Sequence, residues 1–100
     1  MSDINDLVQE LVPEYLALRK QEVAKMMELL AASDFTRLRV LSHSLKGSGS
    51  SFGFPELTRI GAELERNAEA LDAASFTRGL ARLREYLESL DRSPKTRGKA

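Results

Sequence analysis

The side chain with the widest range of chemistry in this sequence is His43, the only histidine among the 100 residues. A neutral imidazole can act near neutral pH as a nucleophile, a general base or a metal ligand. Most zinc enzymes need several histidine or cysteine ligands, and the chain has one histidine and no cysteine, which excludes them. The lack of cysteine also excludes disulfides and thiol catalysis. Nucleophilic or general-base chemistry at His43 is what remains.

His43 is predicted to stand in a polar stripe on the outside of a helix. At 100° per residue, it lies about 160° from Leu41 and Leu45, nearly opposite the apolar line of that helix. Five residues fall within about 60° of His43 by the same arithmetic, namely Thr36, Arg39, Lys46, Gly47 and Ser50. We therefore expect an exposed imidazole with a cation one turn away.

Directly after this cation comes the run Gly-Ser-Gly-Ser-Ser at 47–51. Each glycine inside a helix costs roughly 1 kcal/mol relative to alanine. Either the helix ends at Lys46 and the run is a flexible loop, or the small side chains have a use. A loop would leave a slack connection between Phe52 and Leu57, although both fall on core faces. A use is easily stated, since small residues beside His43 allow the backbone of another protein to approach the imidazole.

Apolar residues recur at helical spacing nearly throughout the chain, and no stretch alternates with period two, so we predict helices and no strands. A short amphipathic segment around Ile4–Leu11 is expected to end before Pro13, because proline suits the first turn of a new helix. The other boundaries are indicated by capping and breaking residues, which are Ser33 or Asp34, Gly53, Pro55, and Asp72 or Ser75.

These segments predict an all-α fold, an up-down antiparallel four-helix bundle with a short extra N-terminal helix. Each long helix has one apolar stripe that only the other helices can bury. We expect Met26, Met27 and the aromatic residues to fill the core, the latter being Tyr15, Phe35, Phe52, Phe54, Phe76 and Tyr86.

The charge of the chain is unevenly distributed, although 15 basic residues balance 15 acidic ones. Residues 1–91, the expected bundle domain, hold 11 basic and 15 acidic side chains, whereas 92–100 hold four basic and no acidic ones. We predict that 92–100 is a disordered basic tail. A neutral chain is a poor candidate for binding nucleic acid or an anionic membrane. With no signal peptide and no apolar run near the roughly 20 residues of a membrane span, we expect a cytoplasmic protein.

The run HSLKGSGSSFGF at 43–54, followed by Leu57, closely resembles the histidine-containing phosphotransfer (HPt) domain motif, and the flanking helices extend the similarity over about residues 3–91. The resemblance implies that His43 accepts a phosphoryl group from a phospho-aspartate of a response-regulator receiver domain and passes it to another receiver. It further implies that the chain has no cofactor of its own, with Mg²⁺ on the receiver, and that a hybrid histidine kinase is another partner. We expect a monomer, although some relatives dimerise through the bundle and the sequence leaves the oligomeric state open.

The resemblance also suggests roles for individual residues. Lys46 would offset the charge of the phosphoryl group, because position i+3 places its ammonium beside it. Glu65 lies about 80° from the apolar axis of the next helix. A glutamate at the matching spacing in chemotaxis-kinase relatives accepts a hydrogen bond from the imidazole Nδ1; alternatively, Glu65 is a surface charge paired with a neighbour. The receiver would dock on Arg39, Gly47 and Ser50.

Two other classes of function compete with the carrier. In the first, an enzyme would use His43 as general base and Ser42, Ser44 or Ser48 as nucleophile, but on one helix these serines point to other faces than His43. In the second, a helical adaptor would bind partners without phosphotransfer. A nucleotide-binding kinase is disfavoured because GSGSSFG lacks the Lys-Ser/Thr of a P-loop. The sequence leaves open whether the protein stands alone or belongs to a larger hybrid kinase.

Overall fold

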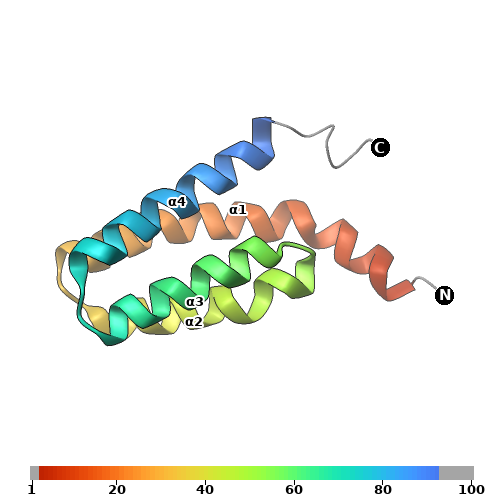
Figure 1. Cartoon of the computed structure of the whole chain (residues 1–100). Coiled ribbons are helices and arrows are strands. Elements are labelled where there is room, and N and C mark those ends of the chain that lie inside the picture. The colour runs from red at the N-terminus through yellow and green to blue at the C-terminus, as the bar shows by residue number, and fades with distance from the viewer. Residues whose placement is uncertain (1–2, 93–100) are drawn as a thin grey trace.

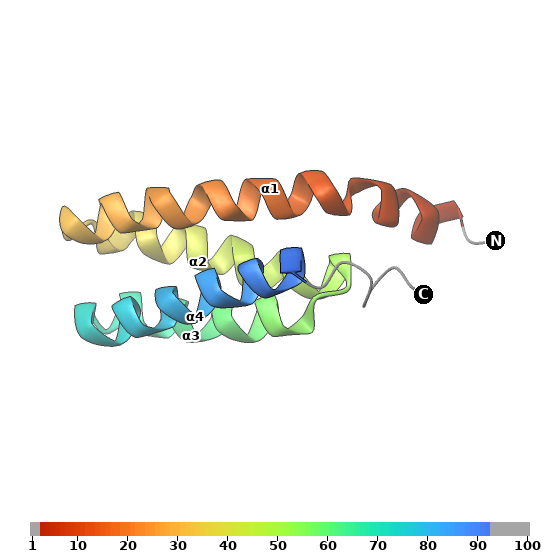
Figure 2. The same cartoon turned by 90° about the horizontal axis from the view of Figure 1, so that it is seen from above.

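The computed structural model describes residues 3–92, which fold as a bundle of four helices (Figure 1). The elements are α1 (Asp3–Ala31), α2 (Phe35–Gly49), a 3₁₀ turn η1 (Ser50–Phe52), α3 (Pro55–Glu69) and α4 (Ala73–Arg92). Consecutive helices run in alternating directions, and no strand occurs in residues 3–92 (Figures 1 and 2). The predicted all-α, up-down four-helix bundle is confirmed.

The expected extra N-terminal helix is instead the first part of α1, which continues through Pro13. Proline lacks the N–H that would bond to the carbonyl of Gln9, but Pro13 and Gln9 are both exposed, so water can bond to that carbonyl. Val12 and Leu16 are buried on either side of Pro13 and hold this stretch of helix on the bundle. The prediction of a helix boundary was therefore wrong, because packing outweighs one lost backbone bond. The first turns of α1 project beyond the ends of the other helices (Figure 2).

Side-chain caps define the beginnings of α2 and α4. Asp34 Oδ1 accepts a hydrogen bond from the Arg37 N–H at 3.2 Å, and Asp72 Oδ1 accepts one from the Ser75 N–H at 3.1 Å. Two residues were predicted as alternative caps for each of these helices, and in both cases the aspartate is the N-cap. At the far end of η1, Gly53 has the left-handed φ of 88° that turns the chain toward α3.

The core lies along the axis of the bundle, where Met26, Leu38, Leu57, Leu64 and Phe76 are completely buried. The six aromatic residues are all buried or partly buried against this core, as predicted. Met27 is the exception to the predicted core, because its side chain is 49% exposed.

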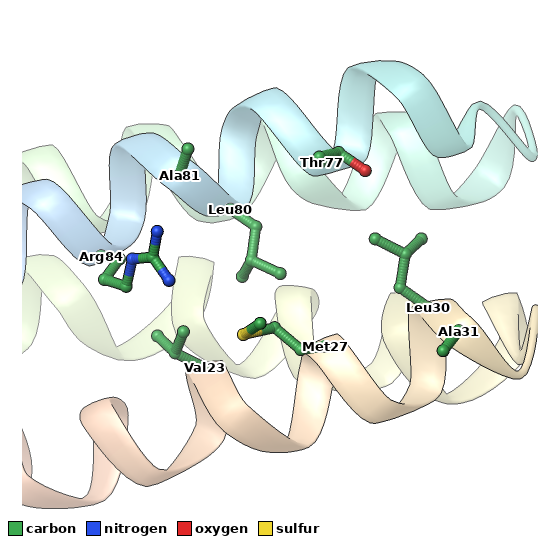
Figure 3. Close-up of a pocket in the computed structure, with 8 residues that line it drawn as sticks. All are labelled: Val23, Met27, Leu30, Ala31, Thr77, Leu80, Ala81 and Arg84. Carbon is green, nitrogen blue, oxygen red and sulfur yellow. The ribbon is translucent and has the colours of Figure 1, made fainter.

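Met27 is exposed because it lies in an open groove between α1 and α4 (Figure 3). The cavity there has a volume of about 330 Å³ and lies away from His43. It is lined by Val23, Met27, Leu30, Ala31, Thr77, Leu80, Ala81 and Arg84. Periodicity identifies which face of α1 is apolar, but not where the neighbouring helices leave part of that face uncovered.

Helices α2 and α3 touch at the level of their backbones. A methyl group added at Gly61 would lie 2.5 Å from the Lys46 nitrogen, and one added at Gly49 would lie 2.6 Å from the Thr58 nitrogen. By contrast, a methyl group at Gly47 would meet nothing within 4 Å. The alternative in which the helix ends at Lys46 is wrong, since α2 continues to Gly49. Gly49 allows the helices to approach, whereas Gly47 lies beside open space.

Part of the predicted C-terminal tail, residues 93–100, lies outside the described residues; Arg92 is the last residue of α4. Within the described part of the chain, no helix combines the length and the apolar character needed to cross a membrane.

Gly61→Ala should destabilise the bundle, because the new methyl group would meet the Lys46 backbone, which cannot move aside as a flexible side chain could. We expect a loss of about 1–3 kcal/mol in the free energy of unfolding, measured by urea denaturation. The matched control is Gly47→Ala, which adds the same methyl group in open space and should stabilise α2 by up to about 1 kcal/mol. Equal stabilities of the two variants would contradict the close contact of α2 and α3.

Candidate functional site

The site is centred on His43, whose side chain projects from the outer face of α2 and is 65% exposed. Its Nδ1 lies 2.9 Å from Oε2 of Glu65 on α3. A carboxylate can only accept a hydrogen bond, so this contact favours the imidazole tautomer with hydrogen on Nδ1. The Nε2 atom then keeps its lone pair and is the nitrogen available for reaction.

Lys46 binds the other oxygen of the same carboxylate. Its Nζ lies 2.9 Å from Oε1 of Glu65, so the two oxygens of Glu65 are divided between the ammonium group and the imidazole. The Glu65 side chain is only 12% exposed, whereas that of Lys46 is 39% exposed. A nearly buried carboxylate therefore joins two side chains that are accessible from outside.

The hydrogen bond from Lys46 is the main reason why the pKa of Glu65 lies below its ordinary value. Burial of the carboxyl group acts in the opposite direction, and the hydrogen bond with His43 and the charges of Lys46 and His43 lower the pKa further. Glu65 is therefore ionised near neutral pH, which it must be to accept a hydrogen bond on each oxygen.

The two helices meet at this site because of the small residue one turn before Glu65. Gly61 packs against the backbone of Lys46, and residues four apart lie on the same face of a helix. Glu65 consequently faces α2 at the level of His43 and Lys46. A larger residue at position 61 would separate the helices and lengthen both contacts of the carboxylate.

The structure places the remaining predicted site residues around His43 on the surface. Arg39 and Gly47 are exposed on α2, while Ser50, also exposed, begins η1. The Ser50 hydroxyl donates to Oγ1 of Thr58 at 3.0 Å. His43, Lys46 and Glu65 are thus brought into direct contact, whereas Arg39 and Gly47 form part of the accessible surface beside them. The roles assigned to all six residues stay predictions.

Two of the serines near His43 have structural partners. Ser42 is fully buried, and its hydroxyl donates to the Leu38 carbonyl at 2.8 Å. Ser48 Oγ lies 2.7 Å from the Tyr15 hydroxyl on α1. This contact forms because α1 packs against this part of α2. Neither arrangement favours these serines as nucleophiles.

Thr58 also belongs to the site, although the sequence did not indicate it. The Thr58 hydroxyl donates to the Lys46 carbonyl at 2.9 Å, one turn beyond His43. The only signal in the sequence is its spacing, because Thr58, Gly61 and Glu65 are three and four residues apart and so share a face of α3. Among the described residues, no group of three or more His, Asp or Glu side chains is arranged to hold a metal ion.

Lys46→Ala should raise the pKa of Glu65, because it removes the largest of the effects that lower it and leaves the opposing effect of burial. Lys46→Arg keeps a cationic donor and should keep the pKa low. A pH titration of the Glu65 carboxyl ¹³C resonance measures both. No change in Lys46→Ala would show that the contact is not formed in solution.

The lowered pKa of Glu65 also determines how the stability of the bundle changes with pH. A lowered pKa in the folded state means that the Glu65 carboxylate stabilises the bundle above its ordinary pKa, and that this contribution disappears as the pH falls through the lowered value. The unfolding free energy of Lys46→Ala should therefore fall less steeply with acidification than that of the wild type.

Comparison with known proteins gives the family of this chain. A family model described as Hpt domain matches residues 5–93, a segment that includes almost all of the four helices and His43, Lys46 and Glu65. Neither a search of curated proteins nor a search of solved structures returned a significant match. The family model covers far more than half of the sequence, and the chain therefore belongs to the Hpt domain family.

Proposed function

We propose that this protein is a phosphoryl carrier in a phosphorelay, in which His43 accepts a phosphoryl group from a phospho-aspartate of a receiver domain, or from a partner kinase, and passes it to another receiver. Membership of the Hpt family implies a role in two-component phosphotransfer. The observation that carries the finer proposal is the exposed imidazole of His43, whose Nδ1 is held by Glu65 so that Nε2 is left to react.

The phosphoryl transfer requires no additional base, because the attacking Nε2 atom carries no hydrogen. The Nε2 lone pair attacks phosphorus, the N–P bond forms, the O–P bond to the aspartate breaks, and the aspartate leaves as a carboxylate. The hydrogen on Nδ1 stays in place, so the phosphorylated ring gains positive charge. The Glu65 carboxylate, 2.9 Å from Nδ1, stabilises that charge. Transfer to the second receiver reverses these steps.

Lys46 offsets the negative charge of the phosphoryl group in this proposal. Its ammonium group is held by Glu65 in the unphosphorylated protein and stands one helical turn from His43, where it can also reach a group on Nε2. Sharing the ammonium between the carboxylate and the phosphoryl group requires only a rotation of its exposed side chain. The receiver docks beside it on Arg39, Gly47 and Ser50, and the open space beside Gly47 supports this placement.

The partner supplies the rest of the chemistry. We infer that the receiver contributes its acidic residues and Mg²⁺, that this protein has no cofactor or ATP site of its own, and that it acts as a cytoplasmic monomer. Size-exclusion chromatography tests whether the protein is a monomer, and cell fractionation tests whether it is cytoplasmic. The adaptor that binds without phosphotransfer is the alternative that the following experiment separates from the carrier.

Mixing the protein with a ³²P-phosphorylated cognate receiver should move label onto it in an acid-labile, alkali-stable form, as expected for phosphohistidine. His43→Gln should accept no label, because the chain has no other histidine. Label on His43→Gln would place the site elsewhere. Binding of the receiver without any transfer to the wild type would favour the adaptor, and labelling by ATP alone would indicate a kinase.

Lys46→Ala should slow transfer by about 10-fold or more, because a positioned charge is lost where negative charge gathers. Gly47→Gln should instead weaken docking, with a higher receiver concentration for half-maximal rate, because its side chain fills the open space next to His43. Gly47→Ala provides a control for helix stability. Rates measured at several receiver concentrations separate the two effects, and wild-type kinetics in Lys46→Ala and Gly47→Gln would remove both roles.

A further inference from the structure

The hydroxyl group of Thr58 lies at the C-terminal end of α2, between the Lys46 carbonyl and the Ser50 N–H. In a continuous α-helix the Ser50 N–H would donate to the Lys46 carbonyl, four residues earlier. Here Thr58 Oγ1 donates to the Lys46 carbonyl at 2.9 Å and accepts from the Ser50 N–H at 2.8 Å. A side chain of α3 thus bridges the Lys46 carbonyl of α2 and the N–H of Ser50, the first residue of η1, at the point where the α-helix gives way to the 3₁₀ turn.

This hydroxyl has a complete set of partners. It has one hydrogen, which goes to the Lys46 carbonyl, and two lone pairs, which accept from the Ser50 N–H and the Ser50 hydroxyl at 2.8 and 3.0 Å. One of these contacts joins α3 to α2, and the other two join α3 to Ser50 at the start of η1. Valine has almost the same shape as threonine but cannot make any of them.

The backbone of Lys46 is therefore fixed to α3 at two points. Its nitrogen and Cα pack on Gly61, and its carbonyl is bound by Thr58. Glu65, which binds both His43 and Lys46, lies on the same face of α3. The register between the two helices, and with it the distance from Nδ1 of His43 to Glu65, depends on these contacts.

We propose that Thr58 is a positioning residue for His43: by bonding to the Lys46 carbonyl and to the Ser50 N–H it holds the end of α2 in the register at which Glu65 reaches Nδ1. The predicted effect on the rate of transfer rests on the proposed function, whereas the predicted effect on the His43 tautomer does not. A displacement of about 1 Å is enough to break a hydrogen bond of normal length and can slow a reaction that depends on orientation by about 100-fold.

The test compares Thr58→Val with Thr58→Ser, which keeps the hydroxyl. The matched control is Thr77→Val on α4, where the hydroxyl bonds only within its own helix, to the Ala73 carbonyl. Two quantities are measured, the fraction of the His43 ring with hydrogen on Nδ1, from ¹⁵N NMR, and the rate of transfer from a phosphorylated receiver at saturation.

Thr58→Val should lower the Nδ1–H fraction and slow transfer at saturation by about 10-fold, with little change in the receiver concentration for half-maximal rate. Thr58→Ser and Thr77→Val should retain both wild-type values. If Thr58→Val does not fold, Thr58→Ala removes the same hydroxyl in a smaller side chain and provides the same two measurements.

An unchanged Nδ1–H fraction in Thr58→Val, an equal loss in Thr77→Val, or no rescue in Thr58→Ser would overturn the inference. Failure of the proposed function is distinguishable, because then the wild type itself accepts no phosphoryl group. The tautomer measurement requires no transfer and would still decide whether Thr58 positions His43.

Discussion

The backbone contact between α2 and α3 is the constraint on which the rest of the site depends. Gly49 and Gly61 leave no room for a methyl group between the two helices, so the helices pack closely enough for short side chains to meet across them. Glu65 can reach His43 and Lys46 only at this separation. The two glycines cost helix propensity, and tertiary packing offsets that cost by bringing the charged groups together.

Within this frame, a single carboxylate organises the charges around the imidazole. Glu65 accepts from Lys46 on one oxygen and contacts His43 with the other, and the ammonium group compensates for the partial burial of the acid. A phosphoryl group on Nε2 would bring new negative charge beside Lys46 and new positive charge onto the ring beside Glu65. The same three side chains can therefore balance the charges of both the free and the phosphorylated state.

The opposite side of the bundle has a different character. The groove between α1 and α4 is lined mainly by apolar side chains and leaves Met27 half exposed (Figure 3). Helices α2 and α3 are thus in closer contact than α1 and α4. The close approach of the α2 and α3 backbones thus lies where geometry matters for the chemistry that we propose.

Much of the fold was predictable because its causes are local. Helical periodicity and the caps Asp34 and Asp72 act within a few residues, so they can be found in one sequence. The prediction failed at Pro13 and Met27, where the outcome depends on neighbouring helices. Pro13 stays within α1 because the residues around it are buried, and Met27 is exposed because α4 does not cover it.

By itself, the sequence determined that His43 is the only imidazole, that it lies on the outer face of a helix, and that Lys46 stands one turn away, because helix geometry relates residues that are close along the chain. Only the tertiary structure decided that Glu65 meets both of them and that Thr58 bonds to the backbone of α2. Those contacts join residues 12 to 22 positions apart. Their distances depend on how closely two helices pack, which no local pattern specifies.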